Sequence, residues 1–213
     1  IRRYARHLVF LAALGGCCSA TAQTSGGSVS VLSEEITVTA RRRENLQSLE
    51  QEAGVKMVII ECDLLEADAP RRIATAALHG LGAVDILVNN AGGSRAFKLD
   101  TGEAQWEEAL TLNFTRQRQL THALLDPMIT RKWGRIINIT SISAKQPIAG
   151  LMLSNALRPA VTGFSKTLAN ELARDGILVN CVAPGYTRTE RVVELAEATA
   201  AREGVTPETV EKR

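Results

Sequence analysis

The chain has 213 residues, 45% of them hydrophobic, which is enough to bury one sizeable core. Its formal net charge is +2, from 25 basic and 23 acidic residues, so it lacks the basic excess typical of nucleic-acid binding. The four cysteines and three histidines follow neither a disulfide-framework spacing nor a metal-ligand spacing, and we expect no metal site.

Residues 1–22 have the three parts of a secretory signal peptide. A basic end at Arg2–Arg6 precedes an apolar run at Leu8–Leu14, and Ala20–Ala22 forms a small-x-small cleavage site. The apolar run is too short to span a bilayer. This pattern predicts cleavage after Ala22 and export of whatever follows.

Residues 23–47 continue with a glycine- and serine-rich stretch and then an acidic, β-branched segment at Glu34–Ala40. Together with residues 1–22, this segment resembles the start of an outer-membrane TonB-dependent receptor. Under this hypothesis the chain is a chimera, joined near Arg41–Gln47 by gene fusion or by misassembled sequence.

A rival interpretation keeps residues 1–47 in a dinucleotide-binding domain, as its first strand, glycine loop, first helix and second strand. Such a loop needs glycines, so that backbone can approach a pyrophosphate at the helix N-terminus. Gly16 fits the first glycine, but Ala20 and Ala22 stand where later glycines belong. Ser25–Ser33 is also a poor helix former. Under this interpretation, residues 23–47 are therefore a degraded first unit of the dinucleotide-binding domain.

From residue 55 onward, strands alternate with helices. Apolar runs predict strands at 55–61, 84–88, 135–139 and 177–182, and helical patterns predict helices at 69–79, 101–125 and 155–173. In the long helix, Trp106, Leu110 and Phe114 are four residues apart and are expected on one core-facing side. The alternation predicts an α/β fold with a doubly wound, Rossmann-like parallel sheet, whose ligands bind beyond the carboxyl ends of the strands.

Small and polar motifs follow these predicted strands in a fixed order. They are Cys62-Asp63-Leu64, Asn89-Asn90-Ala91-Gly92-Gly93, Asn113 within Thr111–Phe114, Ser141 at the end of Gly134–Ser141, Gly163–Lys166 and Val179–Thr187. The set resembles the short-chain dehydrogenase/reductase family, including its 3-oxoacyl carrier-protein reductase-like members, over about residues 48–191. The resemblance implies an NAD(P)-dependent oxidoreductase that transfers hydride between a nicotinamide cofactor and a small-molecule carbonyl or secondary alcohol.

The resemblance also implies a role for each matching residue. The cofactor-binding residues would be Asp63 and Leu64 at the adenine, Asn90, Ala91 and Gly92 towards the nicotinamide ribose, and Pro184, Gly185 and Thr187 at the carboxamide. Asn113 would hold a water in a proton relay, and Ser141 would hydrogen-bond the substrate oxygen. If Arg41 belongs to the enzyme, its charge after the second strand favours NADP over NAD.

One departure from the family concerns its Tyr-x-x-x-Lys motif. The spacing places this motif on Ser154–Arg158, so serine replaces tyrosine and arginine replaces lysine. A serine hydroxyl is a much weaker acid than a phenol, whose pKa is about 10 in water. Arg158 keeps a positive charge and can donate to ribose hydroxyls. The predicted catalytic residues are therefore Asn113, Ser141, Ser154 and Arg158, and the alternative is a nucleotide-binding pseudoenzyme or a non-functional chimeric fragment.

The remaining expectations concern the enzyme-like part, residues 48–213. It stops without the family's final strand, so the predicted sheet is incomplete at both ends. The resemblance implies a homodimer or homotetramer, with no nucleic-acid or membrane partner. It also implies a cytoplasmic location, whereas the signal-peptide-like leader would imply export.

Overall fold

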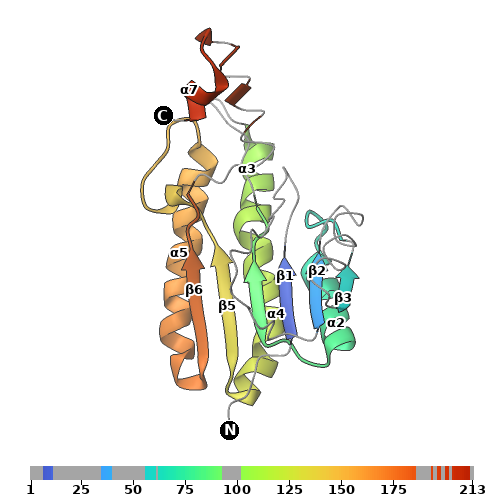
Figure 1. Ribbon diagram of the computed structural model, residues 1–213. Helices are drawn as coiled ribbons and strands as arrows, with labels where there is room; N and C mark the ends of the chain where they lie inside the picture. The colour runs from blue at the N-terminus through green and yellow to red at the C-terminus, as the bar shows by residue number, and fades with distance from the viewer. Residues whose placement is uncertain are drawn as a thin grey trace, which may run out of the picture.

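The computed structural model describes residues 7–11, 35–39, 56–60, 62–92, 102–185 and part of 193–211. Its centre is a parallel sheet of six strands in the order β3-β2-β1-β4-β5-β6 (Figure 1). The strands are β1 (His7–Leu11), β2 (Glu35–Thr39), β3 (Lys56–Ile60), β4 (Ile86–Asn89), β5 (Gly134–Ile139) and β6 (Ile177–Val182). This is the strand order of a dinucleotide-binding Rossmann sheet, and it confirms the predicted α/β class.

Strand β1 lies in the middle of the sheet and pairs on both sides. Its residues run in register with β2 from His7 opposite Glu35 to Leu11 opposite Thr39, and with β4 from Leu8 opposite Ile86. The rival interpretation of the first 47 residues expects two strands here, and β1 and β2 lie within that segment. Cleavage after Ala22 stays a prediction, because Ala22 lies outside the described residues.

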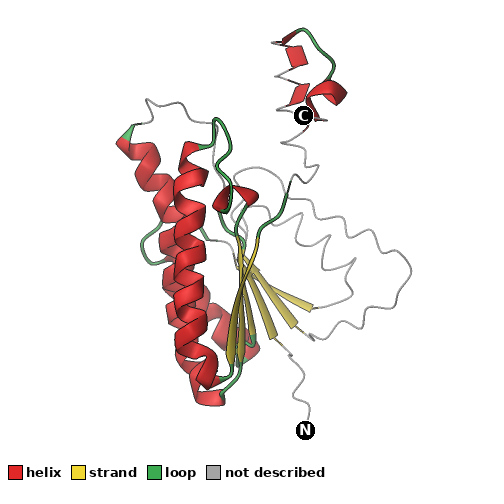
Figure 2. Cartoon of the chain, turned by 90° about the vertical axis from the view of Figure 1, so that its left-hand side faces the viewer, coloured by secondary structure: helices red, strands yellow, loops and turns green. Residues whose placement is uncertain are grey.

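Helices α2, α4 and α5 cover one face of the sheet (Figure 2). The described helices are α2 (Ala69–Leu81), α3 (Glu103–Leu110), α4 (Arg116–Arg131), α5 (Met152–Leu172) and the short α7 (Pro207–Glu211). Pro70 opens α2, where its missing N–H costs nothing, and α4 ends at Lys132, which adopts the left-handed conformation. Among the described helices, none is long and apolar enough to cross a bilayer.

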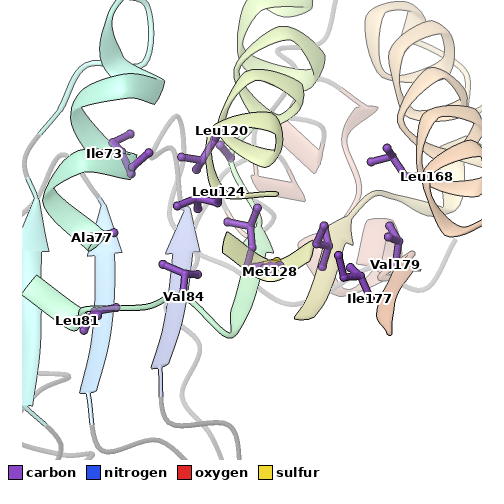
Figure 3. Close-up of a cluster of buried hydrophobic side chains, with 14 of the residues drawn as sticks. Ile73, Ala77, Leu81, Val84, Leu120, Leu124, Met128, Leu168, Ile177 and Val179 are labelled. Atoms are coloured by element: carbon purple, nitrogen blue, oxygen red, sulfur yellow. The ribbon is translucent and has the colours of Figure 1, made fainter. Parts of the chain in front are cut away.

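The core fills the space between these helices and the sheet (Figure 3). Ile73 from α2, Leu120, Leu124 and Met128 from α4, and Ile136 from β5 are each fully buried. Burying one such side chain stabilises the fold by about 1.5–3 kcal/mol. The same cluster reaches Leu87 on β4 and Ile177 on β6, and it therefore fixes the helices against the central and outer strands.

The predicted helix 101–125 is interrupted by a π-helical turn at Thr111–Thr115, between α3 and α4. The extra residue in that turn changes the rotational phase of the helix. The expected stripe of Trp106, Leu110 and Phe114 is wrong, because Leu110 is 44% exposed while the other two are partly buried. The interruption places Asn113 inside the turn, buried at 2% exposure.

Gly176, in the tight connection from α5 to β6, provides a test of this packing. Its φ is +73°, and a Cβ there would lie 2.2 Å from the Lys132 carbonyl oxygen. We expect Gly176→Ala to lower the free energy of unfolding by more than about 2 kcal/mol, since left-handed strain of about 1–2 kcal/mol adds to a backbone clash. Urea denaturation measures the loss.

Gly150→Ala is the matched control. Gly150 has a similar φ of +77°, but a Cβ at this position would have no atom within 4 Å. This variant should lose only the backbone strain of about 1 kcal/mol. Equal losses in the two variants would contradict a role for the Lys132 contact.

Candidate functional site

Parallel pairing brings the carboxyl ends of the strands to one edge of the sheet. Four predicted site loops leave this edge: Asp63–Leu64 after β3, Asn90–Gly92 after β4, Ser141 after β5 and Pro184–Gly185 after β6. The order of strands reverses between β1 and β4, and a crevice at such a switch point is where ligands of this type of sheet bind. The fold therefore brings these loops to the same edge of the sheet.

The loops after β5 and β6 are joined by backbone hydrogen bonds. The Thr140 amide donates to the Val182 carbonyl at 2.7 Å, and the Thr140 hydroxyl donates to the same oxygen at 3.1 Å. The Ile142 amide donates to the Pro184 carbonyl at 3.3 Å. Ser141 and Pro184 are thus held beside each other, although they are 43 positions apart in sequence.

Gly92, Asn113 and Arg158 meet at the end of β4. A Cβ on Gly92 would lie 2.6 Å from Asn113 Oδ1 and 3.2 Å from Arg158 Nη2, and the φ of Gly92 is +130°. Only glycine fits this close approach without strain. Asn113 Nδ2 donates to the Ala109 carbonyl at 2.8 Å, which fixes its side chain within the π-helical turn.

Arg158 is a buried cation, with 9% of its surface exposed. Its Nη1 donates to the Ile139 carbonyl at 3.0 Å, while its Nε has no hydrogen-bond partner. Burial lowers the pKa of the Arg158 guanidinium from its usual range, and no carboxylate among the described residues counters that effect. A buried guanidinium with unused donors is a binding group for oxygen-rich ligands.

Three serines, Ser141, Ser143 and Ser154, are linked by hydrogen bonds at the loop after β5. Ser141 Oγ accepts a hydrogen bond from the Ser143 amide at 3.2 Å and caps a short 3₁₀ turn. The Ser143 and Ser154 hydroxyls are 2.9 Å apart, and both are buried. Ser141 is only partly buried, so its hydroxyl is the one of the three that a ligand reaches most readily.

The loop after β3 is a tight polar turn. Asp63 Oδ1 accepts a hydrogen bond from the Leu65 amide at 2.9 Å, which is the geometry of an Asx turn. Leu64 packs into the core at 5% exposure. Burial also raises the pKa of the neighbouring Cys62 thiol, so that thiol is protonated at neutral pH.

Sequence reasoning assigned no role to a buried polar network beneath this edge. Asn89 and Asn138 lie opposite each other on β4 and β5, and Asn89 Nδ2 donates to Asn138 Oδ1 at 2.8 Å. Asn89 also donates to Thr121 on α4 at 3.0 Å, and Asn138 donates to Ser165 on α5 at 2.7 Å. The sequence signal for this network is an asparagine at an inward-facing position of each apolar strand, because a buried polar side chain needs a hydrogen-bond partner.

The structure brings most of the predicted site residues to this edge. Asp63, Leu64, Asn90, Ala91, Gly92, Asn113, Ser141, Ser154, Arg158, Pro184 and Gly185 all lie on its loops or on the two helices behind them. Arg41 and Thr187 lie outside the described residues. The individual roles of these residues stay predictions.

Comparison with known proteins identifies the family. A family model described as short chain dehydrogenase matches residues 12–200. The chain belongs to the short-chain dehydrogenase family. The match begins within the segment that resembles a receptor leader, so it gives no support to a chimeric junction near Arg41–Gln47.

Curated relatives include reductases and nodulation proteins. The chain is 38% identical to nodulation protein G of Azospirillum brasilense over 150 residues, covering 70% of this chain and 61% of the relative. It is 34% identical to the 3-oxoacyl-acyl-carrier-protein reductase of Aquifex aeolicus over 158 residues, covering 74% of this chain and 64% of the relative. The chain thus spans about three fifths of the length of such relatives.

Solved structures of the family superpose well on the chain. L-sorbose reductase from Gluconobacter frateurii, complexed with NADPH and L-sorbose, gives a TM-score of 0.74 at 29% identity, covering 80% of this chain and 66% of that one. An actinorhodin polyketide ketoreductase with NADPH gives 0.75 at 32% identity, covering 83% and 70%. Both are similar to this chain across its sheet and helices.

The buried network offers a test of how the site is supported. We expect Asn138→Leu to lower the free energy of unfolding by about 2–4 kcal/mol, because Asn89 and Ser165 each lose a buried hydrogen-bond partner. Asn180→Leu, on the solvent-exposed side of β6, is the control and should change stability by less than about 0.5 kcal/mol. Chemical denaturation of both variants decides, and equal effects would argue against the network.

Proposed function

We propose that this protein is an NAD(P)-dependent oxidoreductase that transfers hydride between a nicotinamide cofactor and a small-molecule carbonyl or secondary alcohol. Membership of the short-chain dehydrogenase family supports this proposal. So do the similar reductases crystallised with NADPH. The observation that carries it is the buried guanidinium of Arg158 at the strand ends, which no carboxylate among the described residues neutralises.

The residues at this edge fit a dinucleotide. Arg158 Nη2 lies beside the backbone at Gly92, and ribose hydroxyls are acceptors that suit a guanidinium donor. The absence of a side chain at Gly92 lets the side chains of Asn113 and Arg158 lie directly against the backbone after β4. Asp63 and Leu64 would hold the adenine end, and Pro184 and Gly185 the carboxamide end.

In the proposed mechanism, the bound nicotinamide supplies or accepts the hydride, and the protein handles the oxygen and its proton. Ser141 donates a hydrogen bond to the substrate oxygen and orients it. Arg158 holds the ribose and places a positive charge near the oxygen where negative charge develops. Asn113, whose side chain is fixed by its bond to Ala109, would hold a water in the proton relay.

The site lacks the tyrosine that the family's motif places as proton donor. We propose that Ser154 and Arg158 occupy the positions of the family's tyrosine and lysine. Ser154 donates to or accepts from Ser143 in the interior, and a serine hydroxyl is a poor general acid. Carbonyl reduction should therefore be slow even where cofactor binding is intact.

A second candidate function is nucleotide binding without redox turnover. The Ser143–Ser154 pair favours it, because each hydroxyl already has a buried partner and needs none from a ligand. Under this interpretation Arg158 keeps the binding function and the acid–base function is lost. A preference for NADP stays a proposal that depends on Arg41.

Ligand-induced stabilisation tests the binding half of the proposal. NADPH at a hundredfold excess over its Kd should stabilise the protein by about 2.7 kcal/mol. Gly92→Ala should abolish that increment, because the added Cβ would displace the side chains of Asn113 and Arg158 from their places in the site. Differential scanning fluorimetry with NADPH and NADH measures it and compares the two cofactors.

Gly163→Ala is the matched control for this experiment. Gly163 lies within α5, and nothing is within 4 Å of a Cβ placed there. The exchange should raise the melting temperature slightly, because alanine favours helix, and leave the NADPH increment unchanged. No increment with either cofactor in the unmodified protein would refute the proposal.

Restoring the phenol tests the catalytic half. We expect Ser154→Tyr combined with Arg158→Lys to raise kcat by about 10²-fold or more over a panel of ketones, since general acid catalysis contributes on that order. Ser154→Phe with Arg158→Lys has the same ring without the hydroxyl and should show no gain. The rate of NADPH consumption, followed by its absorbance, is the readout. Equal rates for the tyrosine and phenylalanine variants would contradict the assigned position.

A further inference from the structure

Arg116, the first residue of α4, is a second buried arginine with an unusual set of partners. It is 8% exposed. Its Nε donates to the Leu64 carbonyl at 2.6 Å, and its Nη2 donates to the Leu65 carbonyl at 3.0 Å. Its Nη1 donates to Gln119 Oε1 at 2.8 Å, one turn along the same helix. Three donors of one guanidinium are therefore fixed in a single orientation.

The two carbonyls belong to the loop that leaves the end of β3. Backbone carbonyls near the core need donors, and no backbone amide of the described loop donates to the Leu64 or Leu65 carbonyl. A planar guanidinium can donate to two adjacent carbonyls at once, which a lysine ammonium cannot match in geometry. Burying a cation costs desolvation free energy. The cost indicates that a fixed position of this loop is important for the protein.

The next residue along α4, Gln117, does the same for the loop after β4. It is 3% exposed, and its Nε2 donates to the Ala91 carbonyl after β4. Two consecutive side chains of one helix therefore hold the loops after β3 and β4. Both follow directly on the π-helical turn that contains Asn113.

We propose that Arg116 is a positioning residue that fixes the adenine end of the dinucleotide site, with Gln117 as the corresponding anchor for the ribose end. This inference rests on the proposed function, since it assigns the loop after β3 to adenine. Arg116 touches no ligand in this role. It acts through the Leu64 and Leu65 carbonyls and ties their loop to the helix behind Asn113.

The test separates the two ends of the cofactor. Arg116→Ala removes the two hydrogen bonds that hold the Leu64 and Leu65 carbonyls. It should therefore weaken the binding of ADP-ribose and NADPH by about tenfold. The binding of reduced nicotinamide mononucleotide should be unaffected. Gln117→Leu should weaken the mononucleotide more than ADP-ribose. Calorimetric titration gives each affinity.

Hydrogen–deuterium exchange without ligand tests the positioning directly. The peptide covering residues 62–68 should exchange faster in Arg116→Ala, and less so in Arg116→Lys, which keeps the charge and loses the fork. Arg118→Ala is the matched control, because Arg118 makes no hydrogen bond to any described residue of this loop. If Arg116→Ala does not fold, Arg116→Lys carries both measurements.

Faster exchange together with selective loss of ADP-ribose binding supports the inference. Unchanged exchange, or equal weakening of ADP-ribose and the mononucleotide, overturns it. If the unmodified protein binds neither ADP-ribose nor NADPH although the loop exchanges faster in Arg116→Ala, the proposed function has failed and the adenine assignment fails with it, while Arg116 remains a structural anchor.

Discussion

Parallel pairing of β1 between β2 and β4 is the constraint on which the rest of the structure depends. Its ladders satisfy the backbone groups of three strands in a part of the sheet that has neighbours on both sides. Because every pair is parallel, the carboxyl ends of all six strands reach the same edge. The strand order reverses between β1 and β4, and sheets of this type bind their ligands at such a switch point. Without β1 the outer pair β2–β3 would have no connection to β4.

The second half of this fold could be predicted from sequence, and the first half could not. Strands β3, β5 and β6 are predictable to within one or two residues, because apolar β-branched runs between turn signals identify buried strands. The apolar segment containing β1 fits a leader peptide equally well, since a short buried strand and a signal-peptide core share composition. Long-range pairing of a strand leaves no local signal in the sequence that would separate the two interpretations. The π-helical turn escapes prediction for a similar reason, because a periodic stripe assumes one unbroken helix.

The sequence predicts the site residues that belong to ordered motifs after the strands. It does not predict the buried polar side chains that support those motifs. Asp63, Gly92 and Ser141 follow strands, so their position at one edge follows from topology. Arg116 and Asn138 are polar residues within a helix and a strand, and arginine and asparagine are exposed in most proteins. Their burial depends on which carbonyls and amides lie opposite them in space, and only the packed structure determines that.

Two buried arginines serve this site in different ways. Arg116 uses its donors on Leu64, Leu65 and Gln119, so its burial is compensated within the protein itself. Arg158 donates to Ile139 and leaves Nε without an acceptor, so its burial is compensated only in part. A cation buried with unused donors destabilises the free protein and gains when acceptor oxygens reach it, whereas a satisfied one gains nothing. Their hydrogen bonding therefore matches their proposed roles, because Arg116 holds a loop in place while the Nη2 of Arg158 faces Gly92, where the ligand is proposed to bind.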